Sequence, residues 1–360
     1  MTSRELWIGT YPVAGAGNPV GLGEGVWSVH LDDETGELAD ARQVAVVASP
    51  SFVAADGDRL YAAVEDGAGR VVLLTPDEAG ALTARHETPS GGAYPCHVLV
   101  TEHALLVANY SSGTLGVLPR QADGTFAEAA PQVHGHTGTG PRADRQEGPH
   151  AHFVAIAPGG RHVLVVDLGT DEVRRYAWDG TTATPDGIAA TFAPGTGPRH
   201  LDFSADGRFA YVSGELDGAV HVLAWDAASA TGTPVQQVPA VVVAADARTD
   251  DERARLGQGD HWIRHGAGDL SSHLLVDGDH VLVTVRGADV LTRWRIGSDG
   301  LLVDGRSHAL GGHWPRHFAV VGPFVVVALE KPGELVVLDD AGHARSRLPV
   351  PSAACVLPRD

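Results

Sequence analysis

The sequence predicts an all-β fold, a seven-bladed β-propeller of four-stranded antiparallel blades. Three observations support this prediction: a short phrase recurs about every 45 residues, Val-rich runs of strand length lie between turn signals, and no long helical period is present. The phrase contains Pro or a small residue, one variable residue, an anchor that is usually His, and an apolar β-former. Its six anchors are Phe52, His97, His152, His200, His273 and His317. Radial repetition of four-stranded units at this period is typical of propellers.

Each phrase is followed by the same elements in the same order. An apolar run of five to seven residues ends in a polar residue, and then a Gly-containing turn leads to a second β-rich run. Examples of the apolar run are residues 104–110, 162–167, 209–215, 280–286 and 324–330. The stretch from Leu6 to Ala48 makes a seventh unit. Residues 354–357 are expected to supply the strand that closes the ring against that unit.

The whole chain, residues 1–360, is expected to form one propeller domain. Two units are longer than the rest because they contain insertions, at about residues 133–148 and 244–269. Both insertions are rich in His, Arg, Gly and Asp. Long loops on a rigid scaffold often carry function, although such loops can equally be disordered.

The charge of the chain narrows the classes of partner. It has 26 Lys and Arg residues against 45 Asp and Glu residues, a formal net charge of −19. Nucleic acid and anionic membranes are therefore expected not to be partners, because both are bound mainly through basic side chains. The N-terminus lacks the apolar segment of a signal peptide, and no apolar stretch reaches about 18 residues. We expect a soluble, monomeric, cytoplasmic protein.

Cysteine and lysine are scarce, which limits the available chemistry. Cys96 and Cys355 cannot make a disulfide framework, and Cys96 is expected to be a small buried thiol rather than a nucleophile. Lys331 is the only lysine in the chain, which argues against Schiff-base chemistry.

Polar residues at the starts of the blades are expected to gather at one mouth of the central channel. This set is Cys96, His97, His150, His152, Arg199, His200, Ser272, His273, Arg316 and His317. The polar ends of the following strands could form a second ring, made of Glu65, Asn109, Asp167, Glu215, Arg286 and Glu330. A concave site with several titratable groups is the default candidate for an active site.

A structural interpretation of these residues competes with a functional one. An anchor His repeated in most blades can simply hydrogen-bond its neighbouring blade, so departures from the repeat are better functional candidates. Those departures are His150, Arg199, Arg286 and Arg316, although an Arg in the channel can also be no more than the partner of a nearby Glu. His150 and His152 lie two apart and could reach one metal ion from a strand. With 19 histidines in the chain this signal is weak, and we expect neither a metal nor a cofactor.

Several motifs together resemble a known family. They are Ile8-Gly9-Thr10-Tyr11, Pro95-Cys96-His97-Val98, Pro149-His150-Ala151-His152, Gly197-Pro198-Arg199-His200 followed by Glu215-Leu216, and Trp314-Pro315-Arg316-His317. This pattern resembles the seven-bladed propeller lactonases, the group of the propeller-type 6-phosphogluconolactonases and the 3-carboxy-cis,cis-muconate lactonising enzymes. The chain departs from that pattern at Val285-Arg286, at Ser271-Ser272-His273 and at Ala328-Leu329-Glu330.

The resemblance implies a catalytic set of His152, Arg199, Glu215 and Arg286 at one mouth of the channel. The residues expected to bind substrate around it are His150, His97, His200, Asn109 and Arg316. Lactone hydrolysis needs a base for water and positive groups for the developing oxyanion. Either Glu215 or His152 could be the base, with arginines holding the oxyanion and the substrate anion.

The expected function is metal-independent hydrolysis of a sugar lactone, with 6-phosphogluconolactone as the substrate. The alternatives are a carboxymuconate-type cycloisomerase, a hydrolase of another lactone, or a non-enzymatic propeller that binds a protein partner. From the sequence we expect Glu215→Gln to lower turnover by orders of magnitude while leaving thermal stability nearly unchanged.

Overall fold

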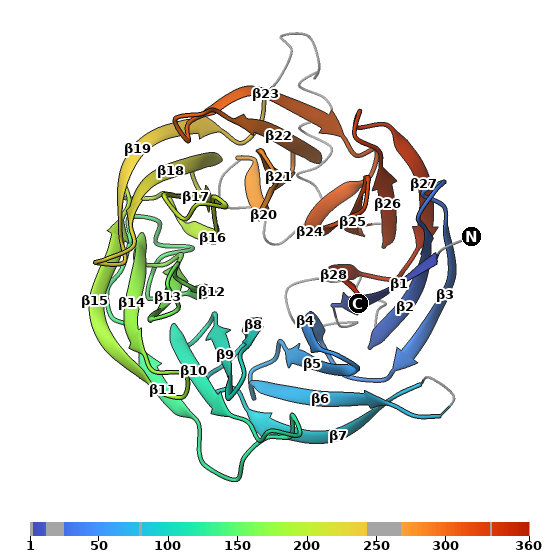
Figure 1. Cartoon of the computed structure of the whole chain (residues 1–360), viewed down its shortest axis with the longest axis horizontal. Helices are drawn as coiled ribbons and strands as arrows, with labels where there is room; N and C mark the ends of the chain where they lie inside the picture. Colours follow the sequence, from blue (N-terminus) through green and yellow to red (C-terminus); the bar gives the residue numbers. More distant parts are fainter. Residues whose placement is uncertain (1–2, 12–24, 79–80, 243–267, 332, 360) are drawn as a thin grey trace.

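Seven four-stranded antiparallel sheets surround a central axis in the computed structural model, which confirms the predicted propeller (Figure 1). The structure describes residues 3–11, 25–78, 81–242, 268–331 and 333–359. In these ranges the only regular elements are strands, and no helix has the length and apolar character needed to cross a membrane. The predicted insertion at 244–269 lies outside the described residues except for its last two positions.

The strands follow one another outward in each sheet, from the axis to the rim. The first sheet comprises β28 (Ala353–Pro358), β1 (Ser3–Thr10), β2 (Val26–Asp32) and β3 (Leu38–Ala45). The second comprises β4 (Pro50–Asp56), β5 (Arg59–Val64), β6 (Arg70–Pro76) and β7 (Leu82–Pro89). The third comprises β8 (Pro95–Val100), β9 (Ala104–Asn109), β10 (Thr114–Pro119) and β11 (Gln132–Gly135).

The remaining four sheets repeat this plan. The fourth comprises β12 (Ala151–Ile156), β13 (His162–Asp167), β14 (Glu172–Trp178) and β15 (Ala183–Thr191). The fifth comprises β16 (Pro198–Phe203), β17 (Phe209–Gly214), β18 (Ala219–Asp226) and β19 (Thr231–Pro239). The sixth comprises β20 (Leu270–Asp277), β21 (His280–Arg286), β22 (Val290–Ile296) and β23 (Leu302–Ala309). The seventh comprises β24 (His313–Val321), β25 (Phe324–Lys331), β26 (Glu334–Leu338) and β27 (Ala344–Pro349).

The two ends of the chain close the ring. Strand β28 pairs antiparallel with β1, so that Ile8 lies opposite Val356 and Trp7 opposite Leu357. The expected closing strand at 354–357 is therefore confirmed. This pairing gives the first blade the same four strands as the other blades and joins the two ends of the chain.

The core consists of apolar layers between neighbouring sheets. The second strands are buried on both faces, as in β13, where Val163, Leu164, Val165 and Val166 are all fully buried. One layer joins Leu164 and Val166 to Val212 of the next blade. Burial on both faces explains why these segments read as continuous apolar runs without alternation.

A β-bulge near the start of every innermost strand directs side chains into the channel. The strand register skips Ser51, Cys96, His152, Arg316 and Ala354, while the irregularities in β16 and β20 cover Arg199–His200 and Ser272–His273. Bulges often re-aim a side chain next to a functional site. The bulge also corrects one predicted anchor: Phe153, not His152, occupies the position equivalent to His97, because His152 is itself the bulged residue.

Candidate active site

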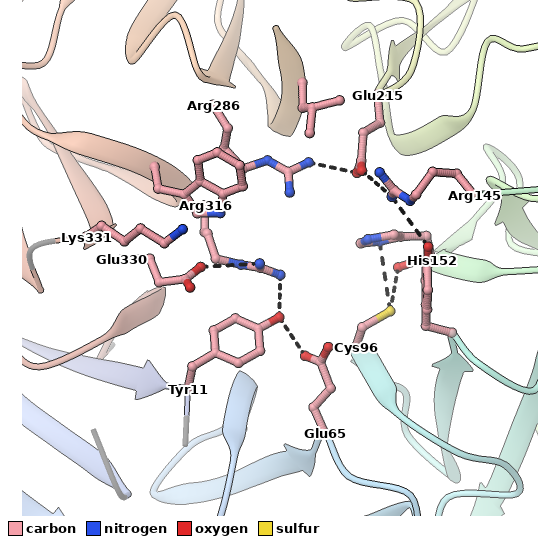
Figure 2. A pocket seen from close by; sticks show the side chains of 13 residues that line it. Tyr11, Glu65, Cys96, Arg145, His152, Glu215, Arg286, Arg316, Glu330 and Lys331 are labelled. Carbon is pink, nitrogen blue, oxygen red and sulfur yellow. Dashed lines mark hydrogen bonds and ion pairs between the residues drawn. The ribbon is translucent and has the colours of Figure 1, made fainter. Parts of the chain in front are cut away.

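A cavity of about 780 Å³, including space open to solvent, lies at one end of the channel (Figure 2). A narrower space of about 300 Å³ shares several of its residues and also reaches Arg199 and His200. The larger cavity is lined by Tyr11, Glu65, Cys96, Tyr110, Arg145, His152, Glu215, Leu270, Arg286, Trp314, Arg316, Glu330 and Lys331. Their charged and aromatic character is that of a site for a small polar molecule.

Two positions of the blade repeat supply most of this lining. One is the bulge, which presents Cys96, His152 and Arg316. The other is the residue that directly follows the second strand of a sheet. Tyr11, Glu65, Tyr110 and Glu215 follow β1, β5, β9 and β17 in this way.

Glu215 is the centre of a buried cluster of arginines. Its Oε1 atom lies 2.5 Å from Nη2 of Arg145, and its Oε2 atom lies 2.9 Å from Nε of Arg199 and 2.8 Å from Nη2 of Arg286. Burial by itself would raise the pKa of Glu215, but the charges of Arg286, Arg145 and Arg199 hold that pKa well below its ordinary value. The carboxylate is therefore ionised, and it is a weak base.

His152 lines both the larger cavity and the narrower space beside this cluster. Burial, reinforced by the charge of Arg199, holds the pKa of His152 well below its ordinary value. The imidazole is consequently neutral near pH 7 and has a lone pair that can accept a proton. Burial also lowers the pKa of Arg199, to about 10, so this guanidinium stays charged at neutral pH.

A second network occupies the opposite wall of the cavity (Figure 2). The hydroxyl of Tyr11 donates to Oε2 of Glu65 at 2.8 Å and accepts a hydrogen bond from Arg316. Arg316 also lies 3.3 Å from Oε2 of Glu330. Burial raises the pKa of Glu65, although Arg316 opposes that shift. The two walls thus differ: three arginines share Glu215 on one, whereas carboxylates surround Arg316 on the other.

Four repeated histidines form a packed layer inside the channel. The rings of His273 and His317 stack with centroids 3.9 Å apart, and His97 lies 4.0 Å from the ring of Phe153. Arg199 donates to Nε2 of His200 at 2.8 Å, so the hydrogen bonds assign the His200 proton to Nδ1, which lies 2.8 Å from Nδ1 of His273. These contacts support the structural interpretation of the anchor histidines.

Acid should destabilise the protein through this histidine layer. Burial lowers the pKa of His97 and of His317 to about 3, whereas an unfolded histidine titrates near 6.5. The free energy of unfolding is therefore unaffected by these histidines above about pH 6.5. Below that pH it falls by about 1.4 kcal/mol per histidine and pH unit, until the pH nears 3. Urea unfolding between pH 7 and 5 should show this slope, and His97→Phe should reduce it. A free energy of unfolding that is constant over this range would contradict the prediction.

The predicted site residues do not all reach the cavity. His152, Glu215, Arg286 and Arg316 line it, and Arg199 and His200 line the narrower space. His97 lies in the histidine layer and lines neither space.

Asn109 and His150 are used within the protein. Asn109 is fully buried, and its amide donates to the carbonyl oxygen of Ser90 at 3.1 Å, because it lies one residue before the position that faces the cavity. His150 stacks on Tyr110, and its Nδ1 lies 3.0 Å from the Tyr110 carbonyl oxygen. Neither residue lines the cavity, and their predicted contact with substrate stays a prediction.

Two other interpretations from the sequence can be placed in the structure. Nε2 of His150 lies 3.2 Å from Oε1 of Glu147, and within the described ranges no group of three or more His, Cys, Asp or Glu side chains is arranged to hold a metal ion. Burial raises the pKa of Cys96 strongly, which keeps the thiol protonated although its Sγ lies 3.9 Å from Nδ1 of His152. Cys96 is therefore a poor nucleophile.

Arg145 is the main site residue that the sequence did not identify. It belongs to the insertion at 133–148, which is fixed on both sides of it. His136 Nδ1 lies 2.5 Å from Oδ2 of Asp167, and Gln146 donates to Oδ1 of Asp171 at 2.8 Å. These two hydrogen bonds thus hold the loop that brings Arg145 to Glu215. The cavity is also lined by four residues that the sequence pattern did not predict as site residues, Tyr11, Tyr110, Trp314 and Lys331. An alignment of the ends of the second strands places both tyrosines at the position of Glu65 and Glu215.

Known proteins resemble this chain in sequence and in fold. The family model described as "Lactonase, 7-bladed beta-propeller" matches residues 5–357. A 6-phosphogluconolactonase of Bacillus subtilis is 32% identical over 372 aligned positions that cover 99% of this chain and 98% of that protein. The Pseudomonas aeruginosa periplasmic gluconolactonase superposes with a TM-score of 0.82 at 26% identity, covering 99% of each chain. The chain therefore belongs to the seven-bladed β-propeller lactonase family.

Proposed function

We propose that the protein hydrolyses a sugar lactone, with 6-phosphogluconolactone as its substrate. The observation that carries this proposal is the buried carboxylate of Glu215, which holds Arg145, Arg199 and Arg286 beside the neutral imidazole of His152. This arrangement combines a proton acceptor with fixed positive groups, the two requirements of ester hydrolysis. Relatives named 6-phosphogluconolactonase, including one from Pectobacterium carotovorum at 28% identity, support the choice of substrate.

His152 is the proposed general base. Both oxygens of Glu215 are bound to guanidinium groups, and those charges lower its basicity. Burial and Arg199 lower the pKa of His152 as well, but its neutral imidazole lines the cavity, whereas both oxygens of Glu215 are already engaged by guanidinium groups. Glu215 then acts as a positioning residue, which fixes the arginines and offsets part of their charge.

In the proposed reaction, water attacks the carbonyl carbon of the lactone while His152 removes a proton from it. The carbonyl π electrons move to the oxygen, and Arg199 and Arg286 stabilise that oxyanion, as each guanidinium has donors beyond those bound to Glu215. The oxyanion then reforms the carbonyl and the bond to the ring oxygen breaks. The imidazolium returns its proton to the ring oxygen, which becomes the hydroxyl of the open acid.

Hydrolysis of freshly prepared lactones tests this proposal. The wild-type protein should release acid from 6-phosphogluconolactone well above the spontaneous rate, and unrelated esters should react no faster than background. Absence of acceleration by folded protein would reject this substrate and favour another lactone or the cycloisomerase alternative. The predicted cytoplasmic location is a separate question, because the Pseudomonas relative is described as periplasmic.

Chelation is expected to leave the rate unchanged, because an imidazole and guanidinium groups supply the base and the oxyanion stabilisation. The measurement is the initial rate of lactone hydrolysis before and after exhaustive treatment with EDTA and dipicolinate. A loss of activity that Zn²⁺ or Mn²⁺ restores would contradict this expectation and return attention to His150 and His152.

A further inference from the structure

Lys331 is the only lysine among 26 basic residues, and it lines the cavity. The lining comprises 13 of the 360 residues, so a lysine placed at random would rarely fall there. Figure 2 shows Lys331 and Arg316 on the side of the cavity away from Glu215 and Arg145. The proposed hydrolysis uses the Glu215 wall, and it gives Lys331 no role.

Trp314 orients the ammonium group of Lys331. Nζ of Lys331 lies 4.3 Å from the centre of the Trp314 ring, and Cζ of Arg286 lies 5.6 Å from the same ring. Both distances fall within the range of cation–π attraction, which is strongest for Trp. The aromatic ring therefore connects the cation of the far wall with an arginine of the catalytic wall.

The backbone conformation of Trp314 fixes the position of its ring in the cavity wall. Its φ of 63° lies in the left-handed region, which bulky residues seldom adopt, and its N–H donates to Oδ1 of Asp289 at 2.9 Å. The equivalent position, directly before the residue that opens the bulged pairing, also has positive φ at Ser49, Tyr94, Gly197 and Ser352. The turn is thus a property of the blades, whereas a large ring at this turn is peculiar to few of them.

The charges that line the two spaces favour a ligand with negative charge. Among the described residues, the lining has five cationic groups against three carboxylates, namely Arg145, Arg199, Arg286, Arg316 and Lys331 against Glu65, Glu215 and Glu330. A lactone ring has no charge with which to balance this excess. A phosphate monoester carries about −1.5 to −2 at neutral pH, which matches the difference.

We propose that Lys331, oriented by Trp314 and acting with Arg316, binds the phosphate group of the substrate at the wall opposite Glu215. This inference rests on the proposed function, in which the lactone carbonyl lies against Arg199 and Arg286. A compact ammonium binds phosphate as a point charge, without the planar geometry that a guanidinium requires. Lys331 is therefore a specificity residue that distinguishes phosphorylated from unphosphorylated lactones.

The stable products allow a direct test by isothermal titration calorimetry. Wild-type protein should bind 6-phosphogluconate more tightly than gluconate. Lys331→Gln should weaken 6-phosphogluconate binding about tenfold or more and leave gluconate binding unchanged. Lys331→Arg should restore part of the loss, and Trp314→Leu should reproduce part of it. Arg345→Gln, at a half-exposed side chain on β27, is the matched control and should change neither affinity.

Equal effects of Lys331→Gln on both acids, or none on either, would overturn the inference. So would a wild-type protein that fails to prefer the phosphorylated acid. Inorganic phosphate should compete with 6-phosphogluconate in the wild type and less well in Lys331→Gln.

Hydrolysis assays separate this inference from the proposed function. Lys331→Gln should raise KM for 6-phosphogluconolactone with little change in kcat, and should leave kcat/KM for glucono-δ-lactone unaltered. If neither lactone is hydrolysed but Lys331-dependent binding of the phosphorylated acid persists, the proposed function fails and the inference stands. Hydrolysis of both lactones without any preference for the phosphorylated one would support lactone hydrolysis and overturn the inference.

Discussion

Glu215→Gln is expected to lower kcat/KM for lactone hydrolysis at least a hundredfold and to destabilise the fold by about 3–5 kcal/mol, the usual cost of removing one partner from a buried ion pair. Arg145, Arg199 and Arg286 all bind this carboxylate, and Glu215 is only 2% exposed. Without its charge, the three guanidinium groups repel one another and lose their positions. The thermal midpoint and the rate should therefore fall together.

This result would differ from the expectation based on the sequence alone, which predicts unchanged stability for the same variant. The matched control is Asp304→Asn, because Asp304 pairs with Arg295 at 2.6 Å but is 66% exposed. Exposed pairs contribute about 0–1 kcal/mol, so this variant should melt nearly as the wild type does. A Glu215→Gln protein with full stability would show that the arginines do not depend on this carboxylate.

Arg199→Lys is expected to reduce kcat about a hundredfold to a thousandfold, the usual effect of losing one oxyanion donor. The Arg199 guanidinium lies 2.9 Å from Glu215 through Nε and 2.8 Å from Nε2 of His200 through Nη1. A lysine ammonium retains the charge, but it cannot span both partners and still face a substrate oxygen. Steady-state kinetics should show the loss mainly in kcat rather than in KM.

The control for this substitution is Arg208→Lys. Arg208 pairs with Asp206 at 2.6 Å and is 69% exposed, and it lines neither of the two spaces in the channel. Its replacement should leave both kinetic constants unchanged. If Arg199→Lys retained wild-type kcat, the oxyanion role would pass to Arg286 or Arg145.

The fold could be predicted because its signals are local and repeated. Buried second strands such as residues 163–166 must be apolar on both faces, and the anchored phrase recurs at six of the seven innermost strands, with His as the anchor in four of them. Closure of the ring by residues 353–358 could be inferred from one apolar segment left over at the end of the chain.

The site was predicted less completely because one-residue offsets are invisible in a sequence pattern. The bulge in β12 moves His152 into the position that Cys96 and Arg316 occupy in their blades, so His152 was assigned to the anchor series. Asn109 resembles Glu215 as a polar residue at a strand end, yet it lies one position earlier and its side chain is buried in its own blade.

Arg145 could not have been found from the repeat. It lies in an insertion, and tertiary hydrogen bonds such as those of His136 and Gln146 to neighbouring segments bring it to Glu215. Lys331 was noted as the single lysine, but its place in the cavity depends on Trp314, a contact between side chains 17 residues apart. Such contacts follow from the tertiary structure and not from spacing.

The most direct test of the central claim is the rate of hydrolysis of freshly generated 6-phosphogluconolactone by the wild-type protein and by His152→Gln, both measured against the spontaneous rate. Thermal melts should first show that the variant is folded. The account predicts strong acceleration by the wild type and a rate close to background for His152→Gln. A folded His152→Gln protein as fast as the wild type would contradict the account, because the base would then lie elsewhere.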